Sequence, residues 1–207
     1  MKERPILFQA EMVRALRDGS KTQTRRIAKL TDAAHVKEPG KHRRWHPGDP
    51  EARLACPYGQ PGDRLWVRET WAYETHALSA KDHEREGPWV YAADGETALQ
   101  HRLCDRWRPS IHMFRAASRI TLEVTGVRLE HLQDIIDADA LAEGINSWIM
   151  DGFVEATEGK PWEVASKFSI DSPFISAYAV LWEQINGPGS WAANPWVWVV
   201  EFKVVKP

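Results

Sequence analysis

The sequence predicts an α+β fold, a small mixed β-barrel in one domain with insertions on its surface. Several short segments alternate apolar and polar residues or are rich in β-branched residues, which is typical of strands, and a few short segments have helical spacing. Strands and helices do not alternate regularly, and no internal repeat is visible. With 207 residues, the chain is long enough for one well-buried core.

The N-terminal segment predicts a strand, a helix and a second strand. A short apolar run at residues 6–8 is the first strand. Residues 11–19 carry apolar side chains at helical spacing and end at Gly19, which is typical of a helix with a C-terminal glycine. Residues 21–27 alternate and contain β-branched side chains, so they predict the next strand. Residues 30–62 are rich in Pro, Gly, His and charge and predict a long loop or insertion.

The middle of the chain predicts three strands. Residues 61–74 begin with a Pro-Gly-Asp turn and continue with one apolar face, and residues 88–93 form a short apolar run after a loop at 76–88. Residues 118–132 alternate most regularly of all, so the strand predicted there is the best supported in the chain.

The C-terminal part predicts two helices and a last strand. Residues 133–145 have apolar positions at helical spacing, acidic residues early and a glycine at the end. Residues 146–171 favour no element. Residues 172–187 predict a helix that Ser172 caps, with a proline in its first turn and Asn-Gly at its end. The apolar residues 194–205 predict a strand.

Composition predicts a soluble, cytoplasmic protein that does not enter a membrane. No segment approaches the roughly 20 consecutive apolar residues of a membrane span, and the charged N-terminus does not resemble a signal peptide. The two cysteines, Cys56 and Cys104, predict buried thiols rather than a disulfide framework.

Charge is distributed unevenly along the chain. Residues 1–44 contain 12 Lys and Arg against 5 Asp and Glu, whereas the remainder contains 15 against 24. A basic N-terminal portion on an acidic body can attract phosphate, but a solvated basic face would have the same composition. The formal net charge of −2 therefore does not by itself indicate a nucleic-acid-binding protein.

The most suggestive motif is GSKTQTRR at residues 19–26. A hydroxyl such as that of Thr24 becomes a nucleophile when a base takes its proton, and Lys21 can be that base if burial or nearby cations lower its pKa. Arg25 and Arg26 could supply those cations, or bind a phosphate or a carbonyl. On a flat strand, side chains three residues apart point to opposite faces, so only a turn, a bulge or strong twist can bring the two together. A solvated basic hairpin is the alternative.

Several further motifs resemble the ASCH family, in particular its phage and prophage branch. Besides the glycine–lysine–arginine motif at 19–26, the segments that carry the resemblance are PGDRLWVRETW at 61–71, WRPSIHMFRAASRITLEVTGVRLEHLQDI at 107–135, ALAEGI at 140–145 and WVVEFKVV at 198–205. The resemblance implies a PUA-like mixed β-barrel of about five to six strands flanked by short helices. It also implies that residues 1–207 form a single domain with loop insertions at about 30–57, 76–105 and 146–170.

The resemblance also implies a chemistry. A small bacterial branch of the family hydrolyses the amide of N4-acetylcytidine and other N4-acylcytidines with a lysine, a threonine and a glutamate, which match Lys21, Thr24 and Glu143. Thr24 would attack the acyl carbonyl while Lys21 accepts its proton and Glu143 orients the lysine, or Lys21 or Glu143 would activate a water directly. Arg26 could stabilise the oxyanion, and no metal or cofactor is expected.

Three further residues are candidates for binding the nucleoside substrate. Trp71 could stack on the cytosine ring, although Trp66 or Tyr73 would serve as well. Glu69 could enter the pocket, or be an exposed strand carboxylate. Arg115 could bind phosphate, as Arg119 could, or form surface ion pairs.

Two alternatives remain open at the level of sequence. The arginine-rich residues 102–119 and the basic N-terminal portion are also compatible with an RNA- or DNA-binding ASCH module, or with a ribonuclease that uses the same basic pocket. His42, His46 and Cys56 suggest zinc, but their spacing matches no tight zinc signature.

Overall fold

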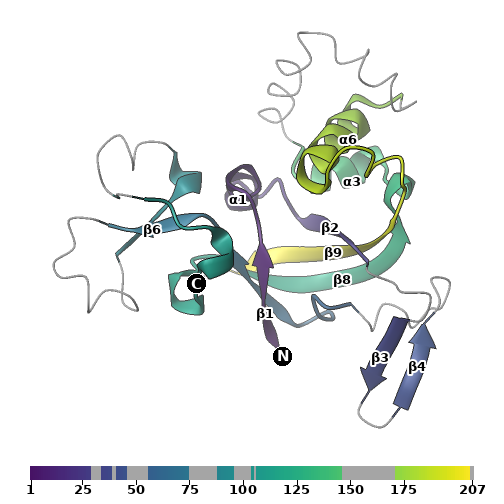
Figure 1. Cartoon of the computed structure of the whole chain (residues 1–207), viewed down its shortest axis with the longest axis horizontal. Helices are drawn as coiled ribbons and strands as arrows, with labels where there is room; N and C mark the ends of the chain where they lie inside the picture. Colours follow the sequence, from purple (N-terminus) through teal and green to yellow (C-terminus); the bar gives the residue numbers. More distant parts are fainter. Residues whose placement is uncertain are drawn as a thin grey trace.

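The computed structural model describes residues 1–28, 34–38, 41–45, 56–74, 88–95, 104, 106–145 and 171–205. At its centre is a five-stranded mixed sheet in the order β1-β5-β8-β9-β2 (Figure 1). Its strands are β1 (Glu3–Leu7), β2 (Gln23–Ile27), β5 (Arg64–Arg68), β8 (Thr121–His131) and β9 (Trp196–Val205). The helices are α1 (Ala10–Arg17), α3 (Asp137–Ala142) and α6 (Pro173–Asn186). A mixed sheet with few helices agrees with the predicted α+β class.

The sheet is built around the pair β8 and β9. These strands pair antiparallel along their whole length, from Thr121 opposite Val205 to His131 opposite Trp196, with one irregularity between Val124 and Gly126. β5 joins the first part of β8, β2 joins β9, and β1 pairs with β5 as the parallel pair of the sheet. The regular alternation of residues 118–132 therefore predicted this central strand correctly.

The described strands form an open sheet. β1 and β2 stand at the two ends of the strand order, and no backbone ladder joins them in the described part of the chain. A side chain crosses between them, since Arg26 of β2 donates from Nη2 to the carbonyl oxygen of Leu7 in β1 at 2.6 Å. The closed barrel implied by the resemblance is thus not found among the described strands, although β8 and β9 are strongly curved (Figure 1).

Both faces of β9 are buried, which explains its nearly continuous apolar sequence. Trp198, Val200 and Phe202 pack in a core with α1, β1 and β5. Val197 and Val199 face the other way and pack with α3 and α6 in a second core. The strand therefore joins the two cores that contribute to the candidate site.

Helix α6 begins and ends where the sequence predicted. The Ser172 hydroxyl accepts a hydrogen bond from the amide of Ile175 at 3.2 Å, and Pro173 occupies the first turn, where no intrahelical amide donor is needed. Gly187 follows the last helical residue.

The helix predicted over residues 133–145 is shorter than expected. A single 3₁₀ turn at Leu132–Asp134 is followed by extended backbone at Ile136, and α3 starts only at Asp137. The carboxylate of Asp139 accepts a hydrogen bond from the amide of Ile136 at 3.4 Å, so an acidic residue caps α3 at this point instead of continuing a longer helix.

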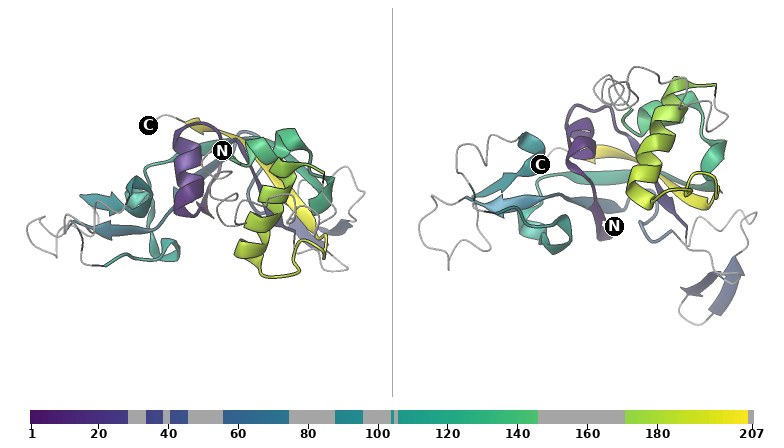
Figure 2. Two further views of the ribbon diagram at one scale, coloured as in Figure 1. Left: turned by 90° about the horizontal axis from the view of Figure 1, so that it is seen from above. Right: turned by 45° about the horizontal axis from the view of Figure 1, so that its top comes forward.

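Two small sheets extend beyond the central one. β3 (Ala34–Glu38) and β4 (Lys41–Trp45) form an antiparallel hairpin, so the predicted loop at 30–62 contains regular structure. β6 (Trp71–Tyr73) pairs with β7 (Trp89–Tyr91), and these strands lie at the opposite end of the molecule from α3 and α6 (Figure 2).

Some sequence predictions have limited or no structural test. Most of the insertions predicted at 30–57, 76–105 and 146–170 lies outside the described residues. Cys56 and Cys104 are buried thiols, as predicted. In the part of the chain that the structure describes, no helix is both long enough and apolar enough to cross a membrane.

Candidate active site

Lys21 lies between the end of α1 and the start of β2. Gly19 has a positive φ of 83°, which turns the chain after α1, and the amide of Lys21 then donates to the carbonyl oxygen of Ala15 at 2.9 Å. Lys21 forms an isolated β-bridge with Glu143, and the adjacent amide of Thr22 donates to Ala142 at 2.8 Å. The backbone therefore attaches Lys21 directly to the C-terminal end of α3.

The structure brings Lys21, Thr24 and Glu143 to one cavity of about 470 Å³. Each of the three residues is only 3% exposed. Lys21 Nζ donates to Glu143 Oε2 at 2.9 Å and to the carbonyl oxygen of Glu143 at 2.6 Å. Because Lys21 precedes β2, the alternation of that strand does not force the side chains of Lys21 and Thr24 to opposite sides.

Burial lowers the pKa of Lys21 below its ordinary value, because the protein interior disfavours the charged ammonium. The ion pair with Glu143 opposes this shift, whereas the nearby cations Arg26 and Arg25 reinforce it. A larger fraction of Lys21 is therefore neutral at a given pH than for an exposed lysine, as a general base requires.

Thr24 is one of the hydroxyl-bearing residues that line the cavity. It lies in β2 opposite Val200 of β9, and its side chain makes no hydrogen bond to another residue in the described ranges. The hydroxyl is therefore available to a ligand in the cavity, while Lys21 Nζ is hydrogen-bonded to Glu143.

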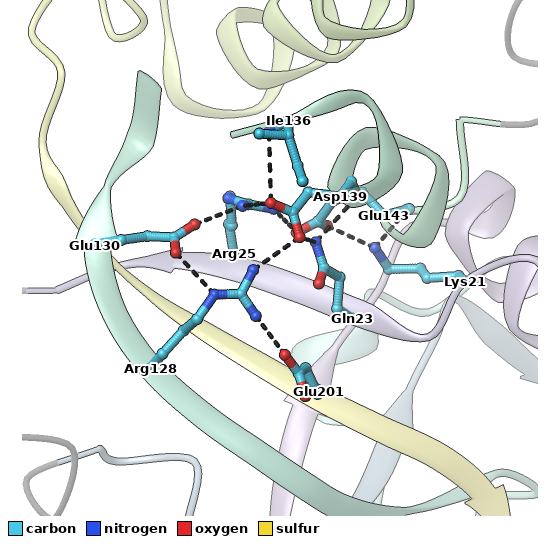
Figure 3. A network of polar contacts seen from close by, with 9 residues as sticks. All are labelled: Lys21, Gln23, Arg25, Arg128, Glu130, Ile136, Asp139, Glu143 and Glu201. Carbon is cyan, nitrogen blue, oxygen red and sulfur yellow. Dashed lines mark hydrogen bonds and ion pairs between the residues drawn. The ribbon is translucent and has the colours of Figure 1, made fainter. Parts of the chain in front are cut away.

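Arg25 connects the cavity to a network of charged side chains (Figure 3). Its Nη1 donates to Glu143 Oε1 at 3.3 Å, and its Nη2 donates to Glu130 at 2.6 Å and Asp139 at 3.0 Å. Burial alone would lower the pKa of Arg25, but these carboxylates together with Tyr178 raise it, so the guanidinium stays charged.

The cavity has aromatic walls that the sequence analysis did not identify. Phe8, Tyr58, Tyr178 and Trp182 line it, and all four lie outside residues 19–26. Lys21 Nζ and the guanidinium carbon of Arg26 lie 5.6 and 5.1 Å from the centre of the Phe8 ring. The helix predicted at 172–187 carries Tyr178 and Trp182, so it is the part of the sequence that could have indicated these two wall residues.

Tyr178 also brings a phenol hydroxyl to these walls. Burial, and next the charge of Glu143, raise the pKa of Tyr178 well above its ordinary value. Its phenol therefore keeps its proton and is a hydrogen-bond donor across the physiological pH range.

The structure places Glu69, Trp71 and Arg115 outside the residues that line this cavity. Glu69 is buried, and each of its oxygens accepts a hydrogen bond of 2.9 Å from Arg119. Burial raises the pKa of Glu69, and Arg119 opposes that shift. Trp71 packs in a separate apolar cluster, and Arg115 donates to Glu3 at 3.1 Å on the surface. The structure thus gives these three predicted binding residues other partners.

Among the described residues, no three His, Cys, Asp or Glu side chains are grouped to hold a metal ion. His46 and the side chain of His42 lie outside the described residues, so the zinc interpretation of that segment has no structural test.

No family model and no curated protein matches the chain. The chain is similar to the solved structure of an ASCH domain from Lactobacillus crispatus JV V101, with a TM-score of 0.36 and 10% sequence identity over 98% of this chain and 79% of that one. Similarity of this degree transfers no residue roles.

Gly144 sets the distance between α1, Lys21 and the end of α3. Its φ is +93°, and an added Cβ would lie 3.0 Å from the Cβ of Ala15 and 3.1 Å from that of Lys21. We expect Gly144→Ala to lower the free energy of unfolding by about 2 kcal/mol or more, since backbone strain and overpacking add.

Urea denaturation measures this loss, and Gly189→Ala is the matched control. Gly189 has a φ of +80° but nothing within 4 Å of an added Cβ, so its substitution introduces the strain without the close contacts. Equal losses in the two variants would contradict the proposed packing of Gly144 against Lys21.

Proposed function

We propose that this protein is a metal-independent amidohydrolase of the ASCH family, of its phage and prophage branch, that removes the acyl group from N4-acylated cytidine. The observation that carries the proposal is the buried pair of Lys21 Nζ and Glu143 Oε2, 2.9 Å apart, at a cavity that Thr24 also lines. Burying a lysine and a carboxylate costs several kcal/mol per charge, and such sites with shifted pKa values occur more often at functional positions.

The first half of the reaction transfers the acyl group. Neutral Lys21 accepts the proton of Thr24 Oγ1 as this oxygen attacks the acyl carbonyl carbon. Arg26 and the protonated hydroxyl of Tyr178 are donors that could stabilise the developing oxyanion. When the tetrahedral intermediate collapses, the C–N bond breaks and the Lys21 ammonium returns the proton to the exocyclic N4, which leaves as the amine of cytidine.

The second half regenerates the enzyme. Neutral Lys21 takes a proton from water as this water attacks the acyl-Thr24 ester. When the ester C–O bond breaks, the Lys21 ammonium returns the proton to Thr24 Oγ1 and the carboxylic acid is released. Glu143 holds the lysine amine in place during both halves. A direct attack by water that Lys21 or Glu143 activates would give the same products without the ester, and the Thr24 variants discussed below separate the two routes.

The cavity suits a free nucleoside. Its volume of about 470 Å³ lies within the range of small-molecule sites, and Tyr58 and Trp182 offer flat apolar surfaces for a pyrimidine ring. Two arginines of the arginine-rich residues 102–119, Arg115 and Arg119, are paired with carboxylates, which makes them less suited to bind RNA or DNA. Paired cations contribute less to phosphate binding than free ones.

A mass-spectrometric assay of N4-acetylcytidine tests the proposal. We expect conversion to cytidine and acetate in the presence of a chelator, with kcat/KM increasing with pH, because Lys21 must lose a proton to act as base. The midpoint of this increase should lie below the ordinary lysine pKa of about 10.4, since burial lowers the pKa of Lys21.

Two results would count against this proposal. The absence of turnover for acetyl, propionyl and benzoyl derivatives would remove the substrate class. A kcat/KM that does not increase with pH at any point below the ordinary lysine pKa of about 10.4 would exclude Lys21 as the base.

A further inference from the structure

We infer that Arg25 is a positioning residue of the proposed hydrolase, which fixes the Glu143 carboxylate so that Lys21 is held toward Thr24. The inference rests on the proposed function for its reaction but adds a residue that does not take part in the chemistry. Arg25 has a side chain that is 0% exposed, yet it forms ion pairs with three carboxylates.

The two oxygens of Glu143 have different partners. Oε2 accepts from Lys21 at 2.9 Å, and Oε1 accepts from Arg25 at 3.3 Å (Figure 3). A carboxylate that is held at both oxygens cannot rotate freely about its last bond, so the lysine amine that it binds keeps one position. Arg25 also balances the buried negative charge of Glu143, which would otherwise be paired with Lys21 alone.

Arg25 is itself held from two elements. Glu130 of β8 and Asp139 of α3 both accept from its Nη2, so the guanidinium is fixed on the side away from Glu143. Arg128 bridges the same two carboxylates at 2.8 Å each and pairs with Glu201 of β9. This chain of alternating charges connects α3, β2, β8 and β9, so Glu143 is positioned by the sheet rather than by the end of the short helix α3 alone.

Arg25 also influences the titration of Lys21. The charged and titratable groups that face this network are Glu143, Glu130, Asp139, Arg26, Arg128, Glu201 and Tyr178. Arg25 acts on Lys21 in the direction of a lower pKa, as a nearby cation must. Because this effect needs only a positive charge, a lysine at position 25 would retain it, whereas the restraint on both oxygens of Glu143 needs the guanidinium.

The test compares Arg25→Gln with Arg128→Gln. Arg128 contacts Glu130 and Asp139 but not Glu143, so its loss disturbs the network without releasing Glu143. We expect Arg25→Gln to lower kcat on N4-acetylcytidine about 10- to 100-fold with little change in KM, and to move the pH profile to higher pH. Arg128→Gln should lower the melting temperature and leave the pH profile unchanged.

NMR titration of the Lys21 side chain, assigned with Lys21→Met, gives a second measure that does not need the substrate. We expect the pKa of Lys21 to rise in Arg25→Gln and to remain unchanged in Arg128→Gln. Wild-type kcat together with an unchanged Lys21 titration in Arg25→Gln would overturn the inference. If the wild type does not cleave N4-acetylcytidine but the titration moves as expected, the substrate assignment is wrong and the positioning role stands.

If Arg25→Gln does not fold, Arg25→Lys provides the test. A lysine keeps the charge but cannot donate to Glu143 and to the pair Glu130 and Asp139 through one planar group. We expect a folded Arg25→Lys variant with reduced kcat and a nearly normal pH profile. Full activity in that variant would refute the need for a guanidinium at this position.

Discussion

Replacing Lys21 by methionine is expected to reduce kcat/KM on N4-acetylcytidine by about 10³- to 10⁴-fold, because it removes the proposed general base and acid. Methionine preserves most of the volume and the unbranched shape of the lysine side chain, so the packing against Phe8 and Gly144 can persist. Glu143 keeps its second partner Arg25, which limits the cost of leaving its carboxylate without the lysine.

Single-turnover rates, circular dichroism and the melting temperature together measure this effect. Lys203→Met is the matched control, because the Lys203 side chain is 62% exposed and pairs with Glu123 on the surface. It should leave kcat/KM unchanged. A folded Lys21→Met variant with wild-type activity would show that another group accepts the proton.

The parts of the fold that the sequence predicted best depend on local signals. The strand β8 follows from the alternation of residues 118–132, and α6 follows from Ser172, the proline after it and the glycine at its end. In each case neighbouring residues determine the element. The division of residues 133–145 into a 3₁₀ turn and α3 was missed, because it depends on which acidic side chains bind backbone amides.

The candidate site was only partly predictable, because its contacts join distant residues. Lys21 and Glu143 are 122 positions apart, and it was the resemblance to a family, not spacing, that paired them. Arg25 was recognised as a nearby cation, but its carboxylate partners come from β8 and α3. No pattern within residues 19–26 specifies those partners.

The binding residues illustrate the same limit. Trp71 and Glu69 are close in sequence to a strand of the sheet, yet one packs in an apolar cluster and the other pairs with Arg119. The aromatic walls of the cavity are instead supplied in part by Tyr178 and Trp182 of α6. The sequence pattern of α6 shows an apolar, aromatic helix surface. Such a surface is expected for packing in a core as well as for lining a cavity, so the pattern does not distinguish the two.

Thr24 distinguishes the two routes of hydrolysis. If its hydroxyl forms an acyl ester, Thr24→Val should reduce turnover by about 10³-fold or more, since valine keeps the branched shape of threonine and removes the nucleophile. Thr24→Ser should retain substantial activity, because it keeps the hydroxyl. Thr22→Val is the matched control, since Thr22 is an exposed threonine two residues away.

Intact-protein mass spectrometry after rapid acid quenching gives the decisive observation for Thr24. An acylated wild type that loses its label on dilution, together with an unlabelled Thr24→Val, is the pattern expected for an ester intermediate. If a folded Thr24→Val variant keeps the wild-type rate, no ester forms at Thr24, and water activated by Lys21 or Glu143 attacks the substrate directly. Since Lys21 Nζ is held by both the side chain and the carbonyl oxygen of Glu143, that outcome would keep the base and change only the nucleophile.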